Sequence, residues 1–144
     1  MNSVIISKAG GPEVLEYKEL KLEDPKADEV TIKNHAIGLN YIDTYHRSGL
    51  YPLTLPSPIG LEGAGEITKV GSEVKDFKVG DKVAYCAAPL GAYSTHRNYP
   101  TKNLVKVPDS VDLETAATLM TKGITTFYLL HKTYPVKSGE DILF

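Results

Sequence analysis

The sequence predicts a mainly β domain with some α structure: an antiparallel barrel followed by helices. Two observations support this fold class. Short runs of alternating or β-branched residues recur at close spacing, separated by Gly and Pro, which is typical of small antiparallel barrels. After residue 108 the pattern changes, and apolar residues then follow the spacing of a helix. A chain of 144 residues is long enough to bury one hydrophobic core.

The first half begins with a predicted hairpin. The runs SVIISK and VLEYKEL are two strands joined by the turn cluster AGGPE. The alternating run EVTIKNHAIGL predicts a longer strand. A short helix is expected next over NYIDTYHRSG, with Asn40 as its cap and Gly49 as its stop. The segment YPLTLPSPIG has three prolines and is predicted to be a loop.

After this loop the chain contains four more strand-like runs before the helical region, namely EGAGEITKVG, DKVAYCA, GAYSTHRNYP and LVKVP. Asp109 or Ser110 is the expected N-cap of the helical region, and Gly123 is expected to divide it into two helices. The terminal DILF is typical of the start of a buried parallel strand. Because a strand with no partner ends a domain poorly, we expect the natural protein to continue beyond Phe144.

Composition narrows the function. The chain is 42% hydrophobic and 24% charged, with a net charge of −2 and no basic block, so nucleic acid is not the expected partner. The apolar runs are too short to span a bilayer, and no secretory signal is recognised, so no membrane role is expected. The single cysteine, Cys86, forms no internal disulfide and suits a reducing compartment, so we expect a cytoplasmic protein.

A zinc site requires several converging ligands. The chain contains Cys86 and four histidines, with neither a C-x-x-C nor an H-x-x-x-H motif. These counts exclude a structural zinc ribbon, and we expect no catalytic zinc. The stretch AIGLNYIDTYHRSGLYP, residues 36–52, is unusual in another way. It gathers three tyrosines with Asn40 and Asp43 but no lysine or glutamate, which raises the question of what these groups contact.

The most specific motif is GLEGAGEITKVGSEV, residues 60–74, with the pattern G-x-E-x-x-G-x-x-x-x-x-G-x-x-V. It resembles the signature of the medium-chain dehydrogenase/reductase superfamily. GGPEVLE, AIGLNYIDTYHRSGLYP, GDKVAY, LGAYSTH and KGITTFYLL resemble one branch, the zinc-free, zeta-crystallin-like NADPH:quinone oxidoreductases. The resemblance extends, in order, over essentially the whole chain.

This resemblance implies a GroES-like barrel on the substrate side, followed by a Rossmann domain whose phosphate-binding turn would come after Phe144. We therefore expect a substrate-side domain at residues 1–122, and a linking helix with the first Rossmann strand at 123–144. It also implies NADPH as the cofactor and a homodimeric full-length protein. The groups that select NADPH over NADH would lie beyond Phe144, so the isolated chain is expected to be inactive.

Three positions depart from the zinc-dependent relatives. Asn40 stands where those enzymes have a cysteine ligand, and Leu61 where they have a histidine ligand. Neither side chain binds zinc well. Ile42 replaces the hydroxyl of the proton relay. Alcohol oxidation needs a metal or a base to form an alkoxide, whereas a quinone is electron-poor and accepts a hydride without that help. These departures are consistent with a quinone as substrate.

By matching position, the resemblance also assigns site residues. Asn40 and Tyr51 are the expected catalytic residues, the first as a hydrogen-bonding group and the second as a wall of the pocket. The expected cofactor contacts are Asn40, Tyr41, Ile42, Asp43, Thr44, Tyr45, Tyr51, Thr125 and Tyr128. Alternatives remain open. Tyr41 and Tyr45 are also consistent with core aromatics, and Asp43 with a helix cap. Glu62 is expected to be structural, paired with a cation or a backbone amide.

Three functions follow from these expectations. The first is NADPH-dependent reduction of a quinone without zinc. The second is reduction of the conjugated double bond of an enal or enone in the same cleft. The third, in another class, is a non-enzymatic interaction module with a GroES-like barrel. The polar and aromatic groups of residues 40–51 argue against the third function.

Overall fold

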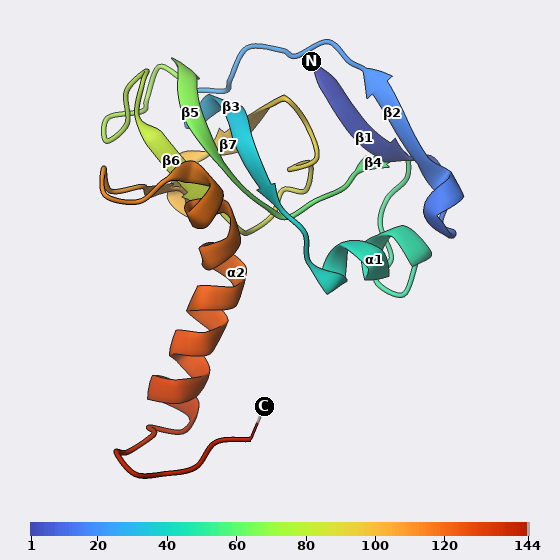
Figure 1. Ribbon diagram of the computed structural model, residues 1–144. Helices are drawn as coiled ribbons and strands as arrows, with labels where there is room; N and C mark the ends of the chain where they lie inside the picture. Colours follow the sequence, from blue (N-terminus) through green and yellow to red (C-terminus); the bar gives the residue numbers. More distant parts are fainter. Residues whose placement is uncertain (144) are drawn as a thin grey trace.

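The computed structural model describes residues 1–143, and the chain forms two antiparallel sheets with two α-helices (Figure 1). The smaller sheet has the order β2-β1-β4, with strands β1 (Asn2–Ile6), β2 (Leu15–Glu19) and β4 (Ser57–Pro58). The larger sheet has the order β7-β3-β5-β6-β8, with strands β3 (Glu29–Gly38), β5 (Glu62–Val70), β6 (Lys82–Tyr85), β7 (His96–Pro100) and β8 (Val105–Lys106). The predicted mainly β fold is therefore confirmed.

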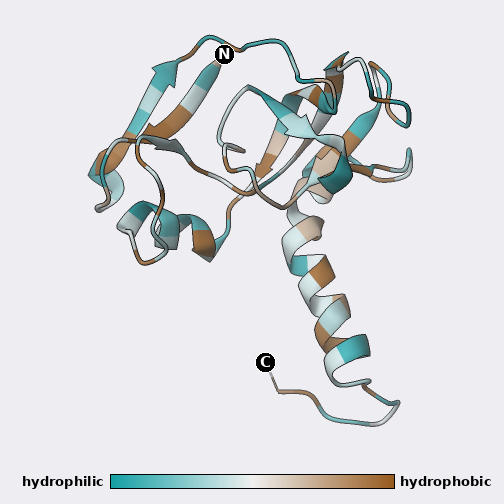
Figure 2. Cartoon of the chain, turned by 180° about the vertical axis from the view of Figure 1, so that it is seen from behind, coloured by the Kyte–Doolittle hydropathy of each residue, from teal (hydrophilic) through white to brown (hydrophobic). Residues whose placement is uncertain are grey.

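The helices are α1 (Tyr41–Ser48) and α2 (Leu113–Tyr128), which a π-helical turn, η3 (Leu129–Thr133), prolongs. Two short 3₁₀ turns, η1 (Pro12–Val14) and η2 (Thr101–Asn103), complete the list. Figure 1 shows α1 at one end of the barrel and α2 extending away from it, and the view from behind in Figure 2 shows the same arrangement. None of the helices in the described part of the chain has the length and apolar character needed to span a bilayer.

Alternation along the strands produces the core. Val30 and Ile32, two positions apart on β3, belong to a buried cluster that also contains Ile67, Tyr85 and Tyr99. A second cluster joins small residues of the sheet to the first turns of α2, where Ala64 and Ala84 pack against Ala116 and Ala117. Alanine at all four positions lets the helix approach the sheet closely. This contact fixes where α2 begins relative to the barrel.

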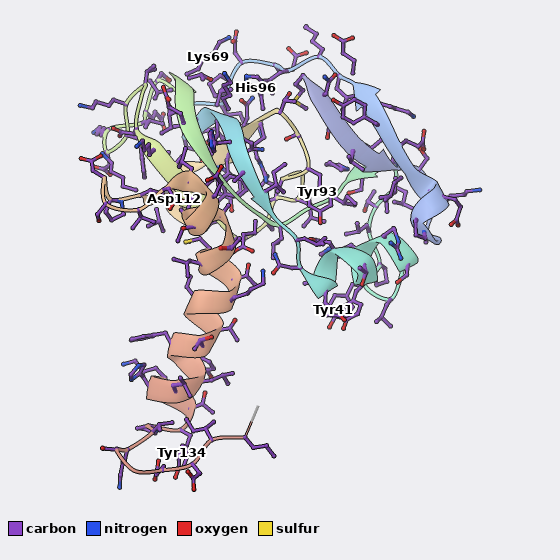
Figure 3. All side chains as sticks on the ribbon, in the orientation of Figure 1. Tyr41, Lys69, Tyr93, His96, Asp112 and Tyr134 are labelled. Atoms are coloured by element: carbon purple, nitrogen blue, oxygen red, sulfur yellow. The ribbon has the colours of Figure 1, made fainter. Side chains whose placement is uncertain are left out.

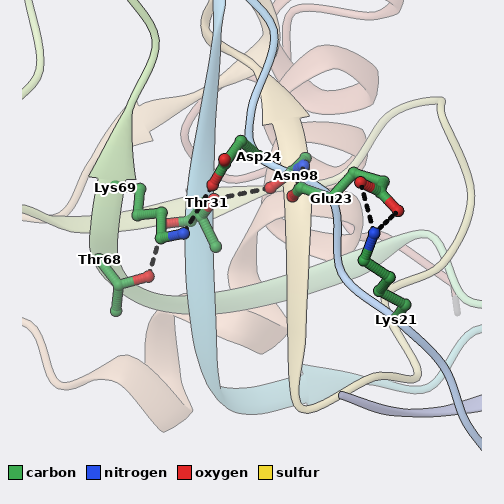
Figure 4. A network of polar contacts seen from close by, with 7 residues as sticks. All are labelled: Lys21, Glu23, Asp24, Thr31, Thr68, Lys69 and Asn98. Atoms are coloured by element: carbon green, nitrogen blue, oxygen red, sulfur yellow. Dashed lines mark hydrogen bonds and ion pairs between the residues drawn. The ribbon is translucent and has the colours of Figure 1, made fainter.

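A chain of polar contacts fastens the segment after β2 to the large sheet (Figure 4). Thr31 Oγ1 donates to Asn98 Oδ1 at 2.7 Å, and Asn98 Nδ2 donates to the Glu23 carbonyl at 2.9 Å. Lys69 forms an ion pair with Asp24 at 2.7 Å. Such exposed ion pairs each contribute little, so the partly buried Thr31–Asn98 contact matters more for the register between β3 and β7.

Three predictions about local structure are wrong. The helix cap is Asp112, not Asp109 or Ser110: its Oδ1 accepts from the Thr115 amide at 2.7 Å. Gly123 does not divide the helix, because α2 is continuous from Leu113 to Tyr128. A glycine in a helix costs only about 1 kcal/mol, which does not interrupt a helix of 16 residues whose first turns pack on the sheet.

The third correction concerns the proline-rich loop. Ser57 and Pro58 form the short strand β4, which pairs with Ile5 and Ile6. A proline is tolerated there because β4 is an edge strand.

The chain end differs from the expected strand in the residues that are described. Asp141–Leu143 forms no strand. A strand requires a hydrogen-bonded neighbour, and none of residues 1–143 supplies one at this point. Phe144, the last residue of the expected strand, lies outside the described residues. The division of the chain at residues 122 and 123 stays a prediction.

Candidate active site

The site begins with the helix α1, which forms where the sequence predicts it. Asn40 has the extended backbone of an N-cap residue, and its backbone N–H donates to Asp43 Oδ2 at 3.0 Å. This contact satisfies one of the backbone amides that a helix start leaves free. Gly49 ends the helix with a φ of 83°, a left-handed conformation that glycine adopts at no steric cost. Both predicted boundaries of this helix are confirmed.

Asp43 joins α1 to the barrel. It is only 3% exposed, and its Oδ2 also accepts a hydrogen bond from the Tyr93 hydroxyl at 2.8 Å. Burial, together with the Asp43 carboxylate, raises the pKa of Tyr93. In Figure 3 Tyr93 lies on the barrel side of α1, whereas Tyr41 lies at the outer edge. The bond from the Asn40 backbone N–H is the contact expected of a helix cap, which is the alternative role for Asp43.

Glu62 connects three parts of the site. It is completely buried on β5, and its Oε1 accepts from the Thr121 amide of α2 at 2.6 Å. Its Oε2 accepts from Asn40 Nδ2 at 2.7 Å. Gly38 leaves room for this carboxylate, because a Cβ there would lie 2.4 Å from Glu62 Oε2. The expectation that Glu62 pairs with a backbone amide is confirmed.

Beside this carboxylate is a hollow of about 560 Å³ lined by Leu39, Asn40, Tyr41, Thr44 and Lys122. Two of its walls are apolar side chains that stay exposed, Leu39 at 71% and Tyr41 at 83%. Lys122 Nζ lies 3.4 Å from the Leu39 carbonyl and 3.5 Å from Asn40 Oδ1. The hollow therefore combines apolar walls suited to a flat ring with one amide oxygen and one ammonium group.

Comparison with known proteins identifies the family. Residues 26–109 match the model of the alcohol dehydrogenase GroES-like domain. The chain belongs to this family. Its GroES-like barrel is the fold that the signature motif predicts. The match covers the large sheet and α1, and hence most of the residues around the hollow.

Relatives of the whole GroES-like chain include reductases. It is 57% identical over 136 residues to a quinone oxidoreductase of Pseudomonas aeruginosa, and 44% identical over 147 residues to a 2-haloacrylate reductase of Burkholderia. These matches cover 94% and 98% of this chain but only 42% and 44% of the relatives. The chain thus spans about two fifths of the length of the curated relatives it matches.

Solved structures give the same result. The crystal structure of Escherichia coli quinone oxidoreductase complexed with NADPH superposes on this GroES-like domain with a TM-score of 0.93 and 46% sequence identity. The match covers 95% of this chain and 42% of that one. A quinone oxidoreductase of Pseudomonas syringae has the same TM-score, 0.93, at 56% identity.

The structure of the GroES-like domain brings only part of the predicted site together. Asn40, Tyr41 and Thr44 line the hollow, and Ile42 is half-buried in the same helix. Tyr45 and Tyr51 do not line it: their rings pack edge to face with centroids 5.4 Å apart, and the Tyr51 amide donates to the Tyr45 carbonyl. Tyr51 is 48% exposed, so its ring remains accessible to a ligand.

Thr125 and Tyr128 are exposed on α2, three and six residues after Lys122. Residues three apart on a helix lie on one face, so this face continues from the hollow along the helix. Lys122 and Leu39 were not predicted as site residues. A helical spacing from Thr125 was the available signal for Lys122, but a lysine on a helix is ordinarily a solvated residue.

The titratable groups near the site do not form a metal centre. Within residues 1–143, His, Cys, Asp and Glu side chains form no group of three or more that is suited to a metal ion. Cys86 is half-buried close to Glu62 and Thr121, and burial, followed by the charge of Glu62, raises the pKa of its thiol. A thiol in this environment is a poor nucleophile, so we assign Cys86 no chemical role.

Proposed function

We propose that this chain is the substrate-side domain of an NADPH-dependent quinone oxidoreductase that transfers hydride without zinc. The observation that carries the proposal is the hollow of Asn40, Tyr41 and Lys122 beside a buried carboxylate. The similarity to quinone oxidoreductases along nearly the whole chain supports it. In this proposal residues 1–122 form the substrate-side domain, and residues 123–144 would provide a linking helix and, once a neighbouring strand pairs with it, the first strand of a Rossmann domain.

The residues present fit the nicotinamide end of the cofactor. A nicotinamide ring is flat and carries a carboxamide, and the hollow offers apolar walls with a hydrogen-bond acceptor and a cation. Asn40, Tyr41 and Thr44 would contact this end. Ile42 and Asp43 would support it from α1. The remaining proposed contacts, Tyr45, Tyr51, Thr125 and Tyr128, would border a ligand that extends beyond the hollow. When bound, the reduced cofactor supplies a hydride.

The donor set around Asn40 is consistent with zinc-free chemistry. Asn40 Nδ2 donates a hydrogen bond to Glu62. Leu61, which precedes Glu62 in the chain, has no atom that can bind a metal. An amide oxygen beside a lysine ammonium is a poor site for a divalent cation, because the ammonium repels it. The chain's own residues would therefore act by binding and orienting the acceptor.

We also propose that the natural protein is cytoplasmic and homodimeric. The free thiol of Cys86 suits a reducing compartment. Light scattering of the natural protein that contains this chain tests the dimer, and fractionation of the cells that produce it tests the location.

Turnover of the natural protein tests the function. We expect NADPH consumption with a simple quinone to exceed that with an alkenal or with 2-haloacrylate, measured side by side. Preference for the alkenal or the haloacrylate would instead assign the double-bond reductase function. The haloacrylate is included because the chain is similar to a 2-haloacrylate reductase. No NADPH consumption with any of these acceptors would contradict both and favour a non-enzymatic module.

A further inference from the structure

A buried carboxylate and an exposed ammonium lie on opposite sides of the Asn40 amide. Glu62 Oε2 accepts from Asn40 Nδ2 at 2.7 Å, and Lys122 Nζ lies 3.5 Å from Asn40 Oδ1. A carboxylate only accepts hydrogen bonds and an ammonium only donates them. Both neighbours therefore select the same orientation of the amide, with its NH₂ group toward Glu62 and its carbonyl toward Lys122.

Glu62 is held in place on its other oxygen as well. Its other oxygen accepts from the Thr121 amide at 2.6 Å, and its side chain is completely buried. One N–H of the Asn40 NH₂ group is thus committed to Glu62. Among the five residues that line the hollow, Lys122 alone carries a positive charge. A ligand oxygen that becomes negative would be stabilised most by this group.

We propose that Lys122 is a catalytic residue, which donates a hydrogen bond from Nζ to the carbonyl oxygen of the electron acceptor, and that Glu62 positions it by fixing the Asn40 amide. This inference rests on the proposed function and goes beyond it in assigning the donor. It also makes the expected hydrogen-bonding role of Asn40 more specific, because its Oδ1 becomes the acceptor that holds Lys122.

The electron balance explains why a cation is useful here. A hydride carries two electrons, so the dihydronicotinamide is oxidised and a quinone acceptor is reduced to the hydroquinone monoanion. The negative charge collects on the oxygen that Lys122 contacts. A proton from water then completes the hydroquinone. An enone would give an enolate at the same oxygen, so this assignment applies to either acceptor.

Binding of para-nitrophenol tests Lys122 without catalysis. Its phenolate resembles the anionic product and absorbs visible light, so its ionisation can be followed directly in the natural protein with the oxidised dinucleotide present. At a pH just below the solution pKa of the phenol, we expect it to bind as the phenolate. Lys122→Met should weaken this binding by about tenfold and abolish the phenolate absorbance, whereas Lys122→Arg should retain it.

The matched control is Lys102→Met, the same change at an exposed lysine of η2 that does not line the hollow. It should leave phenolate binding unchanged. If Lys122→Met binds the phenolate as the natural protein does, or if the natural protein binds no phenolate, the inference is overturned.

Kinetics separate this inference from the proposed function. Lys122→Met should lower kcat for a quinone by about 100-fold, while the KM for NADPH changes by less than about threefold. If the natural protein reduces neither quinone nor enone, the proposed function fails, and phenolate binding still tests Lys122. If the natural protein reduces quinones and Lys122→Met does so equally well, the inference alone fails.

Replacement of the Glu62 carboxylate by an amide tests its positioning role. Glu62→Gln should lower kcat by about tenfold, because the new amide no longer fixes the orientation of Asn40. Glu66→Gln, at an exposed position of the same strand, is the control and should have no effect.

The double variant Glu62→Gln/Asn40→Asp exchanges the amide and the carboxylate. The new glutamine can accept from Thr121 and donate to the new aspartate, whose second oxygen then faces Lys122. We expect kcat to return to within about threefold of that of the natural protein. If the double variant is no faster than Glu62→Gln alone, Glu62 does not position Lys122 through residue 40.

Discussion

The guanidinium of Arg97 lies 4.6 Å from the ring centre of Tyr99, inside the barrel core. It is also 4.8 Å from the ring centre of Tyr85, and Arg97 is only 5% exposed. Its Nη2 donates to the carbonyls of Pro89 and Leu90. Among residues 1–143, no carboxylate forms an ion pair with it. Aromatic faces and backbone carbonyls thus replace the usual counter-ion.

The first prediction follows from this arrangement. Arg97→Lys should lower the free energy of unfolding by about 2–3 kcal/mol, because one ammonium cannot stack on the rings and reach both carbonyls. Urea denaturation measures the change. The same substitution at Arg47, which is half-buried and donates through Nε to the Gly10 carbonyl, should cost less than about 1 kcal/mol. Equal losses at the two positions would contradict a special role for the tyrosine rings.

Two glycines give opposite predictions for the same substitution. Gly123 lies within α2, and an added Cβ would make only ordinary contacts with Leu119, the nearest atom being 3.6 Å away. Gly123→Ala should therefore raise the free energy of unfolding by about 0.5–1 kcal/mol through helix propensity. Gly80 has open space around it but a φ of 90°. Gly80→Ala should lower the free energy of unfolding by about 1 kcal/mol, through backbone strain alone.

Thermal unfolding of the two variants measures these changes. A loss of stability in Gly123→Ala would indicate that α2 is interrupted at this position in solution, as the sequence alone suggests.

Local signals in the sequence predict most of this fold. Alternation predicts β3 and β5, and Asn40 and Gly49 mark both ends of α1, because each of these features depends on neighbouring residues. The continuity of α2 could not be predicted in this way. A single glycine lowers helix propensity locally, whereas the packing of Ala116 and Ala117 on the sheet fixes the helix start from outside the segment.

The candidate site was predictable in part for the same reason. The resemblance in residues 40–51 indicates that Asn40, Tyr41 and Thr44 belong to one site, and these three meet at the hollow. Lys122 is about eighty residues away in the sequence and reaches Asn40 only because α2 packs against the barrel. The orientation of the Asn40 side-chain amide depends on Glu62 and Lys122 together. These residues are far apart in the sequence, so no local pattern predicts this orientation.

The contact between Tyr93 and Asp43 predicts a dependence on pH. Tyr93→Phe removes a hydrogen bond to a buried carboxylate, and should lower the free energy of unfolding by about 1–2 kcal/mol near neutral pH. Burial and the Asp43 carboxylate raise the pKa of Tyr93 in the folded state above 10.0, its value in an exposed tyrosine. Above pH 10 the unfolded chain therefore ionises first, and the contribution of Tyr93 to stability is lost progressively.

Urea denaturation at pH 8 and at about pH 11 measures this difference. The stability of the natural protein should fall toward that of Tyr93→Phe as the pH rises. Tyr17→Phe, at an exposed position, is the control and should show no comparable difference at neutral pH. A stability gap between the natural protein and Tyr93→Phe that stays constant across this range would show that the hydroxyl does not contribute through its protonated form.

Gly38 links the stability of the barrel to the geometry of the site. An added Cβ would lie 2.4 Å from Glu62 Oε2 and 2.5 Å from the Ala117 carbonyl, so neither the carboxylate nor α2 can keep its place. Gly38→Ala should lower the free energy of unfolding by more than about 2 kcal/mol and weaken the binding of para-nitrophenolate. Shortening the carboxylate in Gly38→Ala/Glu62→Asp should not restore stability, because the contact with the Ala117 backbone remains. Recovery in that double variant would show that Glu62 alone, and not the packing of α2, requires glycine at position 38.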